Sequence, residues 1–376
     1  MASSTGKEAT KADKQSQGSL ALKEKGRKKA RTPPGPLSSP PPSVERKKAE
    51  LASKLMEPEE RDKEDEELDQ MLSTLDEDEA KNADRRKAIR ERFIAKSEEG
   101  RQSFVKKVYN RFSPHYDHYM EETGHYPAIR RLLRKEVSVH TFHFPALDIS
   151  AGTAVPLEFF LGEVNKKHLI EESPINFIKP DYKGPLIYVN DLADKMIVQA
   201  EVRLEMLKKN LETEAENLGL SAPPLFADFS NGNPMVYKNY SFRNLHSSLK
   251  RRFGTIIVSQ TFHIVGYKDK ENLARAINWA LAPGGRVILL EEFDWKASPK
   301  LTKQAPPSVI RVVGAIASPI KTKKELIMLF KDSDGVPYDM VARSIERIDR
   351  EDPGHEMTIT ILQKPSPGNP TIPLWF

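Results

Sequence analysis

The stretch "LARAINWALAPGGRVILLEEF", residues 273–293, contains the change from helix to strand that decides the fold. Its first half has apolar residues at helical spacing, so we expect a helix over 270–281. Ala-Pro-Gly-Gly follows, a combination that ends a helix and begins a turn. The second half, 286–293, is an apolar run ending in two glutamates, as in a strand buried on both faces. Helix, turn and buried strand together are typical of a parallel α/β sheet.

The same alternation extends in both directions along the chain. Strands are expected at 144–150, 185–191, 223–230, 253–262 and 286–293. Helices are expected at 155–164, 192–219, 270–281 and 320–333. Two last strands, 338–348 and 355–365, are separated by "DREDPG" and should form an antiparallel hairpin. The sequence therefore predicts an α/β, Rossmann-like, doubly wound sheet that is mostly parallel and is made mixed by the C-terminal hairpin.

The part of the chain before this sheet divides in two. Residues 85–143 have helical spacing over 85–112, with Gly100 as a candidate break, and again over 126–137. Residues 1–84 are charged and Pro-rich, and we expect a disordered tail there. The predicted domains are thus the tail at 1–84, a helical lid region at 85–143 and a Rossmann-like domain at 144–376.

The tail has two blocks of opposite charge. Residues 1–50 hold twelve Lys and Arg against five Asp and Glu, whereas residues 51–100 hold ten against seventeen. The basic cluster at 23–31 is interpreted first as solvated tail; the alternatives are a nuclear import signal and a nucleic-acid contact. The acidic segment 57–79 fits a transient solvated helix, with a partner-binding helix as the alternative.

Several classes of site are excluded by composition. The chain of 376 residues has no cysteine, which excludes disulfides, thiolate metal sites and cysteine nucleophiles and fits a reducing, cytoplasmic setting. No apolar run approaches the roughly 18 residues that a membrane span needs. His, Asp and Glu show no metal-ligand spacing, so no metal is expected.

Polar residues close each of the predicted parallel strands. They are Asp148, Asp191, Asp228, the segment 259–263 and the pair Glu291–Glu292. Ligands of open α/β sheets bind beyond the carboxyl ends of the strands, near the switch in strand order. A carboxylate after the second strand suits the two hydroxyls of a ribose, and one after the third strand can accept from an adenine amino group. These residues predict a nucleoside-containing ligand.

The order and spacing of these motifs resemble class I S-adenosylmethionine-dependent methyltransferases over roughly residues 101–365. "LDISAGTA", "IYVNDLADKMIVQA", "FADFS", "FGTIIVSQTFHIV" and "LAPGGRVILLEEF" stand where that family has its cofactor loop, ribose acid, adenine turn, fourth strand and fifth strand. "RFSPHYDHYMEETGHYPAIRRLL" looks like the lid helices of the small-molecule, ubiquinone- and menaquinone-biosynthesis type. The resemblance implies S-adenosyl-L-methionine as the cofactor.

The loop after the first strand departs from the family pattern. Ser150 and Ala154 stand where the family has glycine, and only Gly152 remains. Two readings stay open: a working cofactor loop, in which Thr153 caps the next helix and a carboxylate is favoured at the helix N-terminus, or a structural turn in a degenerate fold. Asn190 and Gly254 also depart from the pattern, and an insertion is expected before the second strand.

The resemblance assigns ten cofactor-binding residues: Asp148, Ser150, Gly152, Thr153, Asp191, Leu192, Asp228, Phe229, Ser259 and Tyr116. Tyr116 and Tyr119 are expected to cover the methyl donor, because aromatic faces suit a sulfonium cation. His263 is the candidate catalytic base, with a packing role as its alternative. We expect Asp191→Ala to weaken cofactor binding with little effect on thermal stability.

The predicted function is transfer of a methyl group from S-adenosylmethionine to an O, N or C nucleophile of a small or lipid-like acceptor. The alternatives are a non-catalytic interaction protein with a vestigial pocket, and a protein or RNA methyltransferase whose basic tail contacts its partner. A nicotinamide oxidoreductase is disfavoured, because no G-x-G-x-x-G follows a strand. "SQTF" after the fourth strand argues against methylation of exocyclic base amines.

Overall fold

A computed structural model of the chain describes residues 63–75, 83–136, 142–171, 176–177, 182, 184–219, 235–238, 241, 253–292, 307–348 and 356–366. The helices are α2 (Lys63–Thr74), α3 (Ala83–Ala95), α4 (Glu98–Glu122), α5 (His125–Glu136), α6 (Val155–Glu171), α7 (Asp194–Asn217), α9 (Tyr267–Ala280), α10 (Pro307–Ile316) and α11 (Lys323–Leu329). The strands are β1 (His143–Phe144), β2 (Ala146–Asp148), β3 (Asn176–Phe177), β4 (Ile187–Asn190), β5 (Met235–Lys238), β6 (Phe253–Ser259), β7 (Leu281–Glu292), β8 (Asp339–Arg347) and β9 (Glu356–Gln363).

The main sheet has seven strands in the order β5-β4-β2-β6-β7-β9-β8. Neighbours from β5 to β7 pair in parallel, and β9 runs antiparallel to both β7 and β8. The expected Rossmann-like mixed sheet with a C-terminal hairpin is therefore confirmed. The strand order reverses between β2 and β6, so the carboxyl ends of these two strands form the switch point at which such sheets bind ligands.

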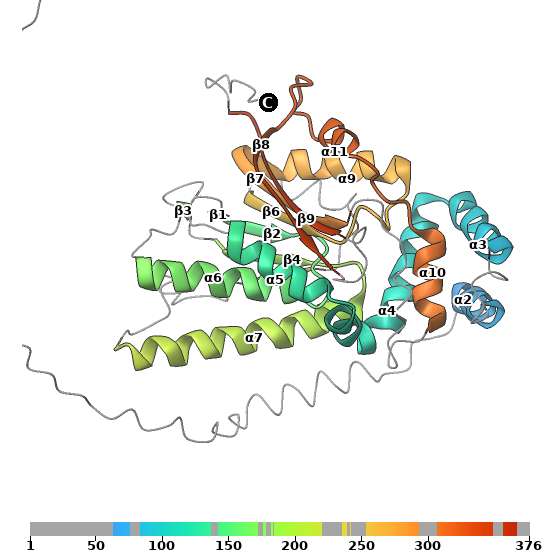
Figure 1. Cartoon of the computed structure of the whole chain (residues 1–376), viewed down its shortest axis with the longest axis horizontal. Helices are drawn as coiled ribbons and strands as arrows, with labels where there is room; N and C mark the ends of the chain where they lie inside the picture. Colours follow the sequence, from blue (N-terminus) through green and yellow to red (C-terminus); the bar gives the residue numbers. More distant parts are fainter. Residues whose placement is uncertain are drawn as a thin grey trace, which may run out of the picture.

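Alternating side chains of the central strands divide the core into two layers. Ile257 of β6 and Ile288 of β7 pack with α6 and α7 on one face, whereas Ile256 and Val287 pack with α9 and α11 on the other. This is the period-2 alternation of a strand covered by helices on both faces. Figure 1 shows α5, α6 and α7 on one side of the sheet and α9 and α11 on the other.

The first predicted strand is divided into two short strands. β1 pairs with β3 in a separate two-stranded sheet, and β2 pairs with β4 and β6 in the main sheet. Gly254 at the start of β6 allows this arrangement, because a Cβ there would lie 2.7 Å from Cβ and 2.8 Å from the carbonyl oxygen of His143. The glycine at 254 thus has a steric reason, and β3 lies in the predicted insertion.

Two other elements differ from the sequence-based expectation. The strand beside β4 is β5 at 235–238, for which no strand was predicted, whereas the strand predicted at 223–230 lies outside the described residues. Helix α10 was also missed, although Pro307 at its first position is a helix-start signal. The break between α3 and α4 falls at 96–97 instead of Gly100, whose amide donates to the Ser97 Oγ at 3.1 Å in the N-cap of α4.

Helix α2 lies in the segment predicted to be tail, and it is packed. Leu68 and Met71 are buried at 1% and 2% exposure, and they join the same core as α10 and α4. Three ion pairs hold the acidic face of α2 to α3–α4: Lys107–Asp65 at 2.9 Å, Lys96–Glu67 at 2.6 Å, and Arg111–Asp69. The expectation of an unfolded chain up to residue 84 is therefore wrong for 63–75, since a few apolar side chains at helical spacing suffice to dock a helix on a preformed surface. The rest of the predicted tail before residue 63 lies outside the described residues.

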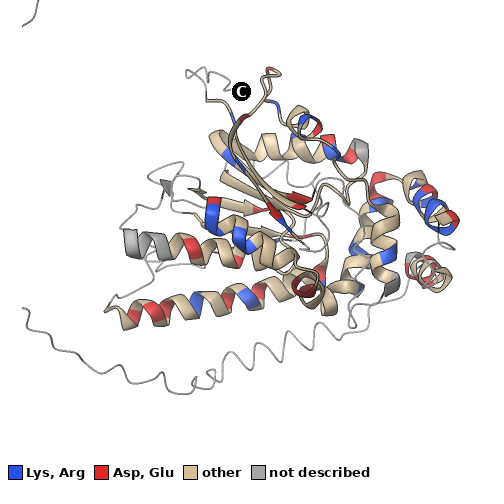
Figure 2. Cartoon of the chain, viewed as in Figure 1, with Lys and Arg blue, Asp and Glu red and all other residues tan. Residues whose placement is uncertain are grey.

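Helices α2, α3, α4 and α10 gather beyond one end of the sheet (Figure 1). Acidic residues predominate on α2 and basic residues on α3 (Figure 2). No described helix is both long enough and apolar enough to cross a membrane.

Candidate functional site

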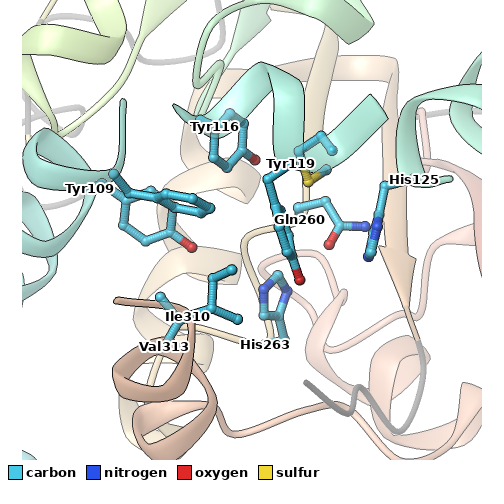
Figure 3. A pocket seen from close by; sticks show the side chains of 10 residues that line it. Tyr109, Tyr116, Tyr119, His125, Gln260, His263, Ile310 and Val313 are labelled. Atoms are coloured by element: carbon cyan, nitrogen blue, oxygen red, sulfur yellow. The ribbon is translucent and has the colours of Figure 1, made fainter. Parts of the chain in front are cut away.

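A pocket lies at the switch point, beyond the carboxyl ends of the parallel strands. It is lined by Tyr109, Phe112, Tyr116, Tyr119, Met120, His125, Gln260, His263, Ile310 and Val313. Helices α4 and α5 form one wall, the loop after β6 forms the floor, and α10 closes the remaining side (Figure 3). The free cavity is about 30 Å³, which holds a few water molecules.

The α4 wall is aromatic because four of its residues recur at helical spacing on one face. The rings of Phe112 and Tyr116 meet edge to face, with centroids 5.4 Å apart and planes at 84°. The ring centroid of Tyr109 lies 6.2 Å from that of Tyr116, and the ring centroid of Tyr119 lies 5.5 Å from that of Phe112. Burial raises the pKa of the Tyr116 and Tyr119 hydroxyls, so both keep their protons at physiological pH.

The loop between β2 and α6 keeps the backbone of a glycine loop. Gly152 has φ +55°, and Ala154 has φ +62°, in the left-handed region that side chains disfavour. A Cβ on Gly152 would lie 3.6 Å from Cε1 of Tyr116, so the aromatic wall faces this loop directly. Ala154 therefore holds a left-handed conformation that glycine would adopt freely, at a cost in strain.

Asp191 ties this loop to the start of α7. Its Oδ2 accepts from the Gly152 amide at 2.8 Å, and its Oδ1 accepts from the Ala193 amide at 2.8 Å. Burial raises the pKa of Asp191 to about 6, although the amides of Ala193, Gly152 and Leu192 oppose the shift. Asp191 thus has a structural role that the sequence did not favour, and with three amide donors on its four lone pairs it has one left for a ligand hydroxyl.

Asp148 is fully buried at the end of β2. Neither of its carboxyl oxygens has a hydrogen-bond partner of normal geometry among the described residues. Burial and then the charge of Asp191 raise its pKa to about 8, while the Ser150 amide lowers it somewhat. The pKa of Asp148 therefore lies above 7, which favours the neutral carboxylic acid at that pH.

Two glutamates at the end of β7 each face a pocket histidine. Glu291 Oε1 accepts from the amides of Thr261 at 2.7 Å and Phe262 at 2.8 Å, and its Oε2 lies 3.4 Å from His263 Nδ1. Glu292 Oε2 lies 3.3 Å from His125 Nε2. The sequence marked the two glutamates as a strand end, but not these pairs, because His125 belongs to a helix more than 150 positions away in the chain.

A polar group that we call the lid cluster joins α4 to the loop and to α7. Its members are Asp117, Tyr126, Thr153, Glu158 and Arg203. Asp117 accepts from Thr153 Oγ1, from Arg203 Nη2 and from the Tyr126 hydroxyl, the last at 2.9 Å. Arg203 also donates to the Thr153 carbonyl at 2.9 Å and to Glu158 at 2.9 Å. Burial alone would lower the pKa of Arg203, but the charges of Asp117 and Glu158 outweigh it and raise that pKa. No single segment of sequence indicated this cluster.

The other predicted site residues are distributed unevenly. Ser259 ends β6 and Leu192 follows Asp191, so both lie at the correct edge of the sheet. Asp228 and Phe229 lie outside the described residues. Gln260, which was not predicted, lines the pocket with φ +53°, a strained backbone for a residue with a side chain. Among the described residues no group of three His, Asp or Glu could hold a metal ion.

Comparison with known proteins shows similarity in fold alone. No protein-family model matches the chain, and no curated protein matches it. The N-methyltransferase NodS from Bradyrhizobium japonicum WM9, in complex with S-adenosyl-L-homocysteine, is 12% identical, with 64% of this chain and 88% of that chain covered and a TM-score of 0.39. The 1,6-didemethyltoxoflavin-N1-methyltransferase of Burkholderia thailandensis is 13% identical, with 70% and 88% covered and a TM-score of 0.39.

A third solved structure is the complex between the Haloferax volcanii Trm112 methyltransferase activator and a candidate methyltransferase. The matching chain is 10% identical, with 70% of this chain and 99% of that chain covered and a TM-score of 0.43. The fold of this chain is therefore described by its own sheet order, and its chemistry is argued from its own residues.

Proposed function

We propose that this protein is an S-adenosylmethionine-dependent methyltransferase that acts on a small or lipid-like acceptor. One observation carries the proposal: the glycine loop after β2 faces the aromatic wall of α4, with Tyr116 Cε1 3.6 Å from the position of a Gly152 Cβ. A loop that can approach a ligand closely and a wall that suits a cation are thereby brought to one place.

The residue types at this edge of the sheet suit the chemical groups of S-adenosylmethionine. Gly152 and its neighbours would lie along the methionine part, Asp191 would accept from the ribose hydroxyls, and Tyr116 and Tyr119 would face the sulfonium. When bound, the cofactor supplies an electrophilic methyl group.

His263 is placed to take a proton from the acceptor. Glu291 lies at its Nδ1, and this favours the tautomer in which Nδ1 carries the hydrogen and Nε2 accepts a proton. The hydroxyl end of Tyr119 points toward His263 in Figure 3, so donor wall and base lie on facing sides of one pocket. Positioning and exclusion of water would supply most of the rate enhancement, and His263 the proton transfer.

The chemistry of the acceptor follows from the remaining lining. Met120, Ile310 and Val313 make that part of the pocket apolar, and no Lys or Arg is among the described residues that line it. This favours an apolar acceptor without a negative charge. A protein or RNA acceptor held by the basic segment 23–31 is the alternative proposal, and that segment lies outside the described residues.

A non-catalytic protein with a vestigial pocket is the second candidate. It is favoured by Asp191, whose two oxygens already accept backbone amides, and by the lid cluster, which holds α4 closed over the loop. In this reading the aromatic wall is a core and not a binding surface.

Calorimetric titration of the full chain separates these candidates. A methyltransferase should bind S-adenosylmethionine and S-adenosylhomocysteine, each with micromolar affinity, and should show no heat with NAD. Absence of heat with both sulfur compounds at millimolar concentration would favour the vestigial pocket, and heat with NAD alone would indicate an oxidoreductase.

A further inference from the structure

The lid cluster contains a carboxylate held by three donors from three different elements. Asp117 of α4 accepts from Thr153 in the loop, from Tyr126 of α5 and from Arg203 of α7. Thr153 and Tyr126 are buried at 1% and 2% exposure, and their hydroxyl oxygens lie 3.1 Å apart. The donors therefore form a preorganised site for one carboxylate, and not a chance surface contact.

Arg203 is oriented for this task by its other bonds. Its Nε donates to the Thr153 carbonyl and its Nη1 donates to Glu158, each at 2.9 Å. These two bonds fix the plane of the guanidinium group, and Nη2 is then directed at the carboxylate position. A fixed guanidinium is the preferred protein partner of a carboxylate.

The position of this site connects it to the cofactor loop. Thr153 directly follows Gly152 and precedes α6, which begins at Val155. The donor that we propose above carries an α-carboxylate on its methionine part, which would lie along the same loop. The loop thus brings a site for one carboxylate next to the expected position of another.

Charge and space do not allow both carboxylates at once. Arg203 already balances Asp117 and Glu158, so a third carboxylate would meet net negative charge in a partly buried setting. Asp117 lies on the helix that carries the aromatic wall, so its release would remove bonds that hold α4 to the loop and to α7.

We propose that Thr153, Tyr126 and Arg203 form the binding site for the α-carboxylate of the methyl donor, and that Asp117 occupies this site as an internal competitor when the donor is absent. The inference rests on the proposed function, since it concerns the same cofactor. Donor binding must then displace Asp117, and replacing the Asp117 side chain should remove this free-energy cost.

The experiment compares S-adenosylmethionine with decarboxylated S-adenosylmethionine, which keeps the ammonium and sulfonium groups and lacks only the carboxylate. Affinities are measured by calorimetry on the full chain and on its Asp117→Asn variant. The variant should bind S-adenosylmethionine about tenfold more tightly, because a neutral amide competes poorly for Arg203, with a much smaller change for the decarboxylated compound. Glu121→Gln, which removes an equal charge from the same helix and contacts Arg130 instead, should change neither affinity.

Arg203 supplies the opposite test. Arg203→Gln should weaken the binding of S-adenosylmethionine more than the binding of the decarboxylated compound. Arg203→Lys should restore part of the lost affinity for S-adenosylmethionine. Melting temperatures of all variants show whether the fold is intact.

Three results would overturn the inference. An equal gain in affinity for both compounds in Asp117→Asn would mean that Asp117 only holds α4 against the loop. Weaker binding of both would mean that Asp117 contacts the ammonium group. Unchanged affinities would mean that the carboxylate lies elsewhere. Failure of the parent and all variants to bind either compound would instead remove the proposed function along with the inference.

Discussion

Acidic residues follow the parallel strands on both sides of the switch point, and their surroundings differ on the two sides. On the side of β2 and β4, Asp148 has no partner of normal geometry and Asp191 accepts only backbone amides. On the side of β7, Glu291 accepts from two backbone amides and lies 3.4 Å from His263. Burying a polar group without a hydrogen-bond partner is costly, whereas several hydrogen bonds fix its geometry. Glu291 is therefore held in one arrangement, whereas Asp148 retains a desolvation cost that a ligand can relieve.

The largest expected effect concerns ligand binding on the β2–β4 side. Gly152→Val should weaken donor binding at least a hundredfold, because its methyl groups would meet Tyr116 and the positive φ disfavours a branched side chain. Gly162→Val is the matched control, since a Cβ there meets nothing within 4 Å. Calorimetry on both variants checks this, and equal affinities would show that the loop is only a turn.

The comparison predicts opposite effects of removing charge from the two sides. The pKa of Asp148, raised from 3.8 to about 8, means that the native state gains stability from the proton below pH 4 and loses it progressively as the pH rises to about 8. Asp148→Asn should then be more stable than the parent at pH 9, by up to several kcal/mol at about 1.4 kcal/mol per pKa unit, with the advantage vanishing near pH 4.

Glu291→Gln is the contrasting variant for this measurement. It should destabilise the fold by about 1.5–3 kcal/mol at pH 9, because two amides and His263 lose a charged acceptor. Urea unfolding of both variants at pH 4 and pH 9 is the test. A pH-independent effect of Asp148→Asn would show that Asp148 is ionised in the native state.

Asp191→Ala tests whether the amide contacts on the β2–β4 side are structural. Loss of the acceptor for Gly152 and Ala193 should lower the free energy of unfolding by about 1–3 kcal/mol, in addition to weakening donor binding. This revises the expectation from sequence that stability would hardly change. Asp194→Ala, which removes a half-exposed charge from the same helix start, is the control. Thermal melts that match the parent would restore the purely ligand-binding role.

The smallest effect concerns strain in the loop. Ala154→Gly should stabilise the fold by up to about 1 kcal/mol, because glycine adopts φ +62° without a Cβ clash. Donor affinity should stay the same or rise. Ala151→Gly in the same loop, where φ is not positive, should instead lower stability by about 0.5–1 kcal/mol. A loss of stability in both variants would place the left-handed backbone of Ala154 in doubt.

Much of the fold could be predicted because its signals are local. The turn after α9, the apolar run of β7 and the period of α7 are each contained in fewer than thirty residues. Elements with weak local signals were missed. β5 has four residues and is held by pairing with β4, and α10 is apolar on most sides because other helices cover it.

The candidate site divides in the same way. By itself the sequence determined that Asp148, Asp191, Ser259 and Glu291 end neighbouring strands, because parallel strands bring their carboxyl ends to one edge whatever the details of packing. Which group each residue contacts was decided only by the tertiary structure. Asp117 meets Arg203 across 86 positions, and His125 meets Glu292 across a still longer separation, and both pairs depend on how α4 and α5 pack on the sheet. Contacts of that kind have no period or spacing in the chain, since they arise from three-dimensional packing and not from local propensity.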